Sequence, residues 1–407
     1  MGQIIANNEQ FETHIQADWR GQLLQTGPDS GVVDAFGRAR TSSPYTLFDS
    51  TMRYDKRPDQ WFDKIVGSGT STFLTNQSSV AMATTTASGD TVLRRTKQNF
   101  PYQAGKSMMM LQSFVGSTPT AGLIQEVGLF NDNNGVMFRA SGTTLQFVIR
   151  SYATGSIVED VVNQADWNLN TLLDLDISKA QILVTDIEWL GVGRVRAGFV
   201  INGEIIYCHE FNHYNTLASV YMTTAILPLS YRIHNASAQA SGRTLKQICC
   251  SVLSEGGYEP DGAIYSINHD LSAVPNTSGE RVTAGIRMVS GRTDNVILPV
   301  RISTTTASSD VILWRLRLNP TISGATWQAA VNGRGNVETI TSGTASGGTV
   351  VDAGFVSQGA ANNYAVAEAI RLSLGQNASG ESDILVLTVD SAVSSKALGM
   401  IGWVEVV

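Results

Sequence analysis

One segment near the middle of the chain constrains the fold more than any other. Ala180–Leu190 and Arg194–Ile201 are two runs rich in β-branched and aromatic residues, joined by Gly191-Val192-Gly193. Asn202-Gly203 is the two-residue signal of a tight type I′ hairpin, which leads into Glu204–Phe211. The segment therefore predicts three consecutive antiparallel strands, with turns at Gly191, Gly193, Asn202 and Gly203.

The same segment ends in His-Glu-x-x-His, which has the spacing of a zinc-protease motif. That motif binds zinc from a helix, where residues four apart place both imidazoles on one face. On a strand, His209 and His213 would lie about 13 Å apart at about 3.3 Å per residue. We therefore expect no metal here, and zinc hydrolysis through His209, Glu210 and His213 is a third-ranked alternative.

Composition and charge argue against nucleic-acid binding. The chain has 407 residues, and charged residues make up only 15% of it, against about 25% in average soluble domains. The formal net charge is −7, and no run of Lys or Arg supplies a patch that could follow phosphates. These features predict that nucleic acid is not a partner.

Targeting and redox signals are also sparse. No apolar run reaches the roughly 20 residues of a membrane helix, and the N-terminus lacks the pattern of a signal peptide. Cys208 and the adjacent pair Cys249 and Cys250 do not match a metal-binding spacing. We expect folding in a reducing cytoplasm, without membrane insertion and without a cofactor.

The organisation along the chain predicts an all-β protein in three parts. Residues 1–50 are polar with scattered apolar positions and are interpreted as an extended anchoring arm. Residues 51–255 predict a jelly-roll or lectin-like β-sandwich, and residues 262–407 a second, C-terminal β-sandwich, separated by the linker EGGYEPDG. A weak helical pattern occurs at Gln164–Leu173. The strand-like runs include Thr91–Arg95, Ile124–Phe130, Gly135–Ala140, Thr144–Ser151, Asn295–Ser303, Ala367–Leu374 and Asp383–Asp390.

Two further patterns bear on carbohydrate chemistry. Asp186 and Glu188 are two apart on one strand face and could supply the carboxylate pair of a glycosidase, although such pairs are more often a solvated strand face. Tryptophans could stack on sugar rings, although core packing is the commoner role. The six considered are Trp61, Trp167, Trp189, Trp314, Trp327 and Trp403.

Two long strings together resemble a family of tailed-bacteriophage virion proteins. Residues 33–50 read VDAFGRARTSSPYTLFDS, and the strand block contains TDIEWLGVGRVRAGFVINGEIIYCHEFN. The family similarly places an Asp-Ala-Phe-Gly-Arg stretch before a β-rich body with a Trp-Leu-Gly-Val-Gly-Arg-Val-Arg hairpin. The resemblance covers residues 33 to 235 well and the C-terminal third only in style. Ala39 departs from the pattern, which has a larger apolar residue there.

The resemblance implies a non-enzymatic structural component of a tailed-phage virion, assembled in the host cytoplasm on the particle exterior. Tail or baseplate is the first expected location, and head decoration or head fibre the second. Its expected partners are copies of itself, for example in a trimer, and other virion proteins. The alternative is a carbohydrate- or host-receptor-binding module that contacts a host surface glycan. The arm residues expected at assembly contacts are Trp19, Phe36, Arg38, Arg40, Tyr45 and Phe48.

Overall fold

The computed structural model divides the chain into two compact units, Met1–Ser43 and Pro44–Val407. In the first unit, β1 (Ile4–Asn8), β2 (Phe11–Ala17) and β3 (Leu23–Leu24) form a small antiparallel sheet. The structure describes residues 4–8, 11–17, 23–24, 43–259, 262–268, 279–292, 295–306, 311–329, 335–357, 362–365, 373–394 and 396–406.

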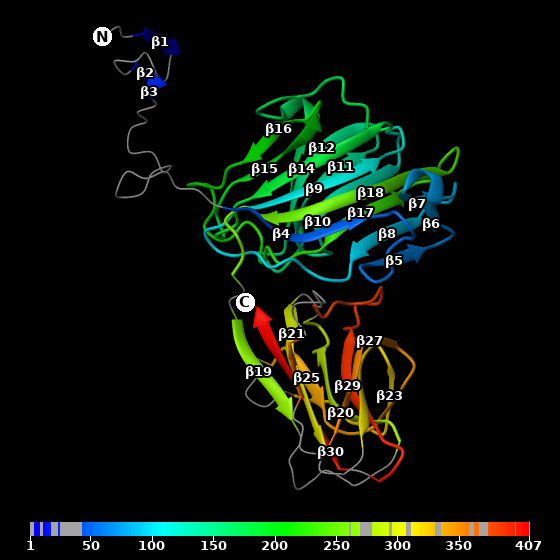
Figure 1. The fold of residues 1–407 in the computed structure, drawn as a ribbon. Helices are drawn as coiled ribbons and strands as arrows, with labels where there is room; N and C mark the ends of the chain where they lie inside the picture. The colour runs from blue at the N-terminus through cyan, green and yellow to red at the C-terminus, as the bar shows by residue number, and fades with distance from the viewer. Residues whose placement is uncertain are drawn as a thin grey trace. The chain divides into compact units, whose positions relative to one another are not determined.

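The protein is all-β, and residues 45–254 of the second unit form a jelly-roll-type sandwich of two antiparallel sheets (Figure 1). The seven-stranded sheet has the order β13 (Val158–Asn163), β12 (Thr144–Ser151), β11 (Gly135–Ser141), β10 (Leu123–Phe130), β17 (Leu229–Asn235), β8 (Thr91–Thr96), β5 (Trp61–Val66). The eight-stranded sheet has the order β16 (Glu204–Phe211), β15 (Val195–Ile201), β14 (Ala180–Ile187), β9 (Met108–Val115), β18 (Arg243–Ser254), β7 (Ser79–Thr84), β6 (Thr70–Leu74), and β4 (Tyr45–Thr51) also pairs with β18.

A second set of sheets is built from residues 262–406. The four-stranded sheet has the order β19 (Gly262–Asn268), β30 (Ala397–Val406), β21 (Val296–Thr306), β28 (Asn362–Ala365). The six-stranded sheet has the order β24 (Gln328–Ala329), β25 (Val337–Ile340), β20 (Arg281–Met288), β29 (Ile384–Asp390), β22 (Ile312–Leu318), β27 (Thr349–Val356), and β23 (Thr321–Ser323) pairs with β26 (Thr344–Ser346). The buried core between these sheets includes Trp314 and Trp403.

Alternating side chains explain the core of the first sandwich. On β9 the buried and half-buried positions alternate along the whole strand, because successive side chains of a strand point to opposite faces. Phe199 of β15 contacts Phe138 of β11, with ring centroids 5.4 Å apart, and so joins the two sheets through aromatic packing. The large buried cluster extends from Phe48 to Val252.

The three-strand prediction is confirmed, with one correction at the turns. β14, β15 and β16 pair antiparallel in sequence order, and Asn202 and Gly203 have φ values of 52° and 87°, as a type I′ turn requires. Gly191 also has a positive φ. A three-residue connection between strands commonly needs a positive φ, which predicts one at Gly193 as well, but Gly193 does not have it and that prediction is wrong. A side chain at Gly193 is excluded by space instead, since its Cβ would lie 2.1 Å from the carbonyl oxygen of Glu188.

Two boundaries differ from the sequence prediction. The arm was placed at residues 1–50, but Tyr45 and Phe48 belong to β4, and Phe48 is buried in the sandwich core. β4 is specified by pairing with β18, about 200 residues away in sequence, which local pattern does not reveal. The helical pattern at Gln164–Leu173 yields only a 3₁₀ turn at Gln164–Asp166.

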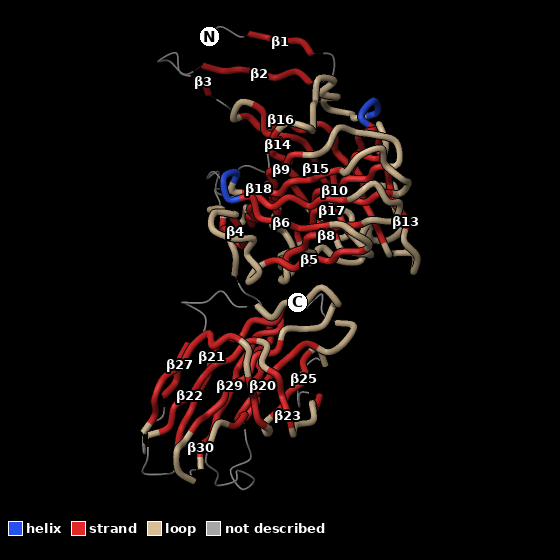
Figure 2. Tube along the Cα trace, turned by 90° about the vertical axis from the view of Figure 1, so that its right-hand side faces the viewer, coloured by secondary structure: helices blue, strands red, loops and turns tan. Residues whose placement is uncertain are grey.

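Helix is confined, in the described part of the chain, to that turn and a second at Thr75–Gln77, drawn in blue in Figure 2. No helix among the described residues is long and apolar enough to cross a membrane. The predicted strand at Ala367–Leu374 falls mostly outside the described residues.

The two hairpin glycines give a test of these different constraints. In Gly193→Ala the added Cβ collides with the backbone of Glu188. In Gly203→Ala the added Cβ enters open space, but alanine must adopt a positive φ, which lowers the stability of the fold by about 1 kcal/mol. We expect the midpoint of thermal unfolding to fall for both and to fall further for Gly193→Ala. Gly89→Ala, which also has a positive φ and open space, is the control for Gly203→Ala. Equal midpoints for wild type and Gly193→Ala would contradict the close approach.

The outer face of the seven-stranded sheet carries a network of ion pairs. Glu126, which is fully buried, lies 2.8 Å from Arg139 and 2.5 Å from Arg232. Glu159 of β13 pairs with Arg139 at 2.7 Å and Arg150 at 2.9 Å. Hydrogen bonds from Arg139 outweigh the opposing effect of burial and lower the pKa of Glu159 to about 2.

This shift predicts a defined acid sensitivity. Because the pKa of Glu159 is lower in the folded state than its ordinary value of 4.5, its stabilisation is complete above that pH and is lost as pH falls toward 2. We expect the difference in unfolding midpoint between wild type and Glu159→Gln to shrink below about pH 4.5. A difference that stayed constant from neutral pH to about pH 3 would contradict the assignment.

Candidate functional site on the outer face of the eight-stranded sheet

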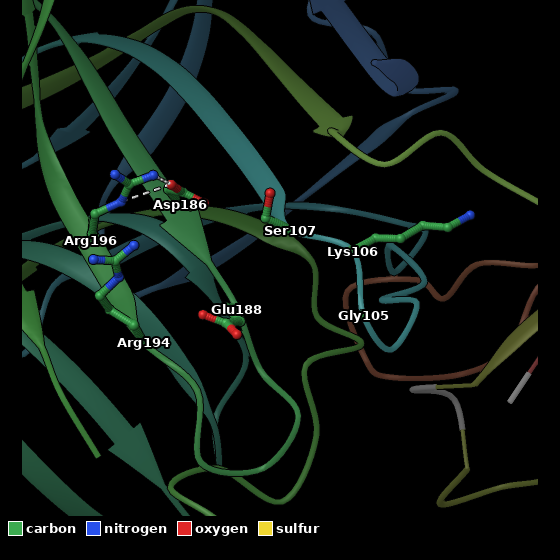
Figure 3. A pocket seen from close by; sticks show the side chains of 7 residues that line it. All are labelled: Gly105, Lys106, Ser107, Asp186, Glu188, Arg194 and Arg196. Atoms are coloured by element: carbon green, nitrogen blue, oxygen red, sulfur yellow. Dashed lines mark hydrogen bonds and ion pairs between the residues drawn. The ribbon is translucent and has the colours of Figure 1, made fainter. Parts of the chain in front are cut away.

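A polar pocket of about 290 Å³ lies at one end of the eight-stranded sheet. Leu183 and Ile187 of β14 point into the sandwich core, so Asp186 between them points to the outer face. Figure 3 shows the pocket residues around this carboxylate. The pocket is lined by Gly105, Lys106, Ser107, Asp186, Glu188, Arg194 and Arg196.

Asp186 is fixed by side chains from the next two strands on one side of β14, namely β15 and β16. Arg196 of β15 is its register partner and donates two hydrogen bonds to Oδ2, one of them from Nε at 3.0 Å. The hydroxyl of Tyr207 on β16 lies 3.3 Å from the same oxygen, and the Arg196 guanidinium stacks 4.3 Å from the Tyr207 ring centroid. Burial, assisted by the charge of Asp186, raises the pKa of Tyr207 to about 12. The three side chains form a rigid, charge-assisted unit.

Glu188 contrasts with Asp186 because its carboxylate is exposed. Its backbone amide still bonds to the Arg194 carbonyl at 2.9 Å, which holds the residue beside the end of β14. No hydrogen bond or ion pair of the Glu188 carboxylate is found among the described residues. The Arg194 side chain is 47% exposed, and within the described part of the chain its ion pair is a long contact of 3.4 Å with Glu210. Both side chains therefore keep hydrogen-bonding capacity for a ligand.

The opposite wall of the pocket comes from the segment that precedes β9. Ser107 donates a hydrogen bond from its hydroxyl to the carboxylate of Glu255, and the Glu255 amide bonds to the Ser107 carbonyl at 2.9 Å. Lys106 Nζ donates to Gln103 at 2.9 Å. Asp186 and Glu188 were predictable from the sequence, but this wall was not, because Ser107 lies about 80 residues from Asp186 and has no motif of its own.

The residues of the His-Glu-x-x-His motif have separate structural surroundings. His209 lies in strand β16, where its Nδ1 accepts a 3.3 Å hydrogen bond from the Asn168 amide. His213 lies beyond the strand, donates from Nδ1 to the Gly193 carbonyl at 2.6 Å and stacks on Tyr221. Burial lowers the pKa of His209. Within the described residues, no group of three His, Cys, Asp or Glu side chains is placed to hold a metal ion.

The other candidate residues do not converge on this pocket. Trp19, Phe36, Arg38 and Arg40 lie outside the described residues. Four of the six candidate tryptophans are buried in the cores, as the commoner role predicts: Trp61, Trp167, Trp314 and Trp403. The remaining two are half-buried, with Trp189 donating to the Met222 carbonyl and Trp327 packing under Arg287.

Comparison with known proteins gives likeness of fold alone. No family model matches the chain, and no curated protein is significantly similar to it in sequence. A Bacillus licheniformis beta-glucanase aligns with 50% of this chain and 96% of its own at 10% identity and a TM-score of 0.35. A beta-1,3-glucanase from Mycobacterium marinum aligns with 51% of this chain and 98% of its own at 12% identity and a TM-score of 0.36.

The CBM2 module of an evolved Dit from Lactobacillus casei BL23 phage J-1 aligns with 54% of this chain and all of its own, at 9% identity and a TM-score of 0.36. The resemblance to virion proteins predicts that the chain is not an enzyme. That prediction is contradicted, because glucanases are among the aligned structures. Enzymatic activity is therefore no longer excluded. Sequence identities and TM-scores this low assign no activity or ligand to the chain.

Proposed function

We propose that the chain is a carbohydrate-binding protein of a tailed-phage virion, with the Asp186 pocket as its sugar site. The observation that carries the proposal is the pairing of a rigid unit, Asp186 with Arg196 and Tyr207, with the exposed groups of Glu188 and Arg194 in one pocket. A sugar presents hydroxyls that both donate and accept. Fixed carboxylate acceptors and guanidinium donors in a concave site match that chemistry.

The virion setting rests on the resemblance of residues 33 to 235 to phage virion proteins. A sugar site fits such a setting, since binding a glycan of the host surface is one way for a particle to attach. Self-association with other copies and assembly with other virion proteins belong to the same proposal. Labelling intact particles with an antibody to this chain tests it, and absence of the chain from purified particles would refute it.

A second candidate function is glycoside hydrolysis, and the placement of Asp186 and Glu188 on one face favours it. Two residues along an extended chain place their Cα atoms about 6.6 Å apart, so both carboxylates start from neighbouring positions of one pocket, and inverting glycosidases use two carboxyl groups about 6.5–9.5 Å apart. In that reaction one carboxyl group donates a proton to the leaving oxygen while the other accepts a proton from the attacking water. Glu188 is the exposed partner and Asp186 the fixed one.

A single set of variants tests both functions. Wild type, Glu188→Gln and Arg194→Ala are screened against host-surface glycans. Glu204→Gln is the control, because Glu204 is exposed at the start of β16, whereas the pocket residue Arg196 pairs with Glu210 near the end of that strand. We expect saturable binding that either pocket variant weakens by about tenfold or more, the size of a lost charged hydrogen bond. The control should bind like wild type.

Each outcome has a distinct meaning. No saturable binding by wild type refutes carbohydrate binding, and equal binding by all variants refutes this pocket as the site. Release of reducing sugar by wild type that is lost in Glu188→Gln supports hydrolysis. Saturable binding without release of reducing sugar supports carbohydrate binding and refutes hydrolysis.

A further inference from the structure

The hairpin turn places Asn202-Gly203 at the surface, and an Asn-Gly pair is chemically reactive. Asn202 is exposed, and the hairpin pairs Ile201 with Glu204, so the Gly203 amide lies in the turn and outside the paired ladder. A Cβ added at Gly203 would meet no atom within 4 Å. The side chain and the amide that follows it are therefore free to approach each other.

A second Asn-Gly pair in the same sandwich is held in the opposite way. Asn134 is only 3% exposed, and its Nδ2 donates to Thr223 at 2.7 Å while its Oδ1 accepts from Tyr152 at 3.2 Å. Gly135 pairs within the sheet, and a Cβ there would lie 2.1 Å from Phe130. Packing immobilises both reacting groups of this pair.

We propose that Asn202 is a site of spontaneous deamidation and isoaspartate formation in the folded protein, and that Asn134 is protected. The Gly203 nitrogen, after losing its proton, attacks Cγ of Asn202, and a nitrogen–carbon bond forms. The bond from Cγ to Nδ2 breaks, and the nitrogen leaves as ammonia with the transferred proton. Water then opens the resulting succinimide at either carbonyl, which gives aspartate or isoaspartate.

The product alters a hairpin that the pocket depends on. The chain on either side of Asn202-Gly203 carries Arg196 on β15 and Tyr207 on β16. Isoaspartate adds one methylene to the backbone of a turn whose two residues both have positive φ. The modification therefore loosens the strand pair from its tip and adds a negative charge beside Glu204.

The test is peptide mapping by mass spectrometry after incubation of the full chain at mildly alkaline pH, folded and in urea. In the folded protein we expect the Asn202 peptide to lose its amide, with isoaspartate detected, while the Asn134 peptide keeps it. In urea both peptides should convert at similar rates, since both contain Asn-Gly. Folded Asn202 converting no faster than folded Asn134 would overturn the proposal.

Asn202→Asp separates the charge from the backbone change. This variant carries the product charge with a normal backbone, so we expect an unfolding midpoint near that of fresh wild type. Aged wild type that contains isoaspartate should unfold at a lower temperature. If aged protein in which mass spectrometry finds most Asn202 converted to isoaspartate were as stable as Asn202→Asp, the effect on the hairpin would be refuted. A third pair, Asn332-Gly333, lies outside the described residues.

Discussion

Replacing Arg94 by Ala is expected to destabilise the protein by about 3–5 kcal/mol, because the largely buried carboxylate of Asp63 loses its buried partner and keeps only the half-exposed Lys56, 2.7 Å away. The Arg94 side chain is 1% exposed and lies inside the first sandwich, where Nη1 is 2.7 Å from Asp63. Its Nη2 donates to the Lys56 carbonyl, and the guanidinium stacks 5.2 Å from the Trp61 ring centroid. Burial lowers the pKa of Arg94, and Asp63 opposes that effect.

Urea unfolding of Arg94→Ala measures the loss, and two comparisons make it specific. Arg57→Ala removes an exposed ion pair with Asp59 and should cost less than about 1 kcal/mol. The double variant Arg94→Met, Asp63→Leu removes both charges and should lose less than Arg94→Ala alone. If Arg94→Ala were no less stable than Arg57→Ala, the buried pair would not have the role assigned to it.

Phe199→Ala is expected to cost about 3–5 kcal/mol, the range for truncating a buried aromatic side chain. Phe199 is fully buried, and its ring lies edge-on to Phe138 and 6.2 Å from Phe147 across the sandwich. The cavity would open where the two sheets meet. Ile205→Ala on the neighbouring strand is the control, since that side chain is 41% exposed and should change stability by about 0.5 kcal/mol. Similar losses for the two variants would contradict the central place of Phe199.

Strands bounded by local turn signals were predictable from the sequence. β12 has the predicted bounds, and the Asn-Gly turn sets the register of β15 and β16. β18 was missed for a physical reason. Its inward face includes Gln247, which accepts a hydrogen bond from buried Arg94, so the alternation of apolar and polar residues is interrupted. A bulge between Gln247 and Cys250 further shifts the pattern.

The candidate site was predictable only in part. Simple alternation along the chain predicts that Asp186 and Glu188 point the same way, and both line the pocket although β14 ends at Ile187. Tyr207 reaches Asp186 because β16 joins the same sheet through β15, and a bulge near Gly198 adjusts the register. Ser107 and Glu255 meet through pairing between β9 and β18, whose residues are far apart along the chain. Contacts of that kind depend on topology rather than on local pattern.

Strand order has a consequence for synthesis of the protein on the ribosome. β17 and β18 are the last strands of the first sandwich, yet each lies inside its sheet: β17 between β10 and β8, and β18 between β9 and β7. β29 and β30 repeat this arrangement in the second set of sheets. Until these late strands emerge, the earlier ones expose unpaired edges that invite association between nascent chains. Each sandwich can therefore close only after its last pair of strands is made, which favours slow folding and dependence on chaperones at high expression.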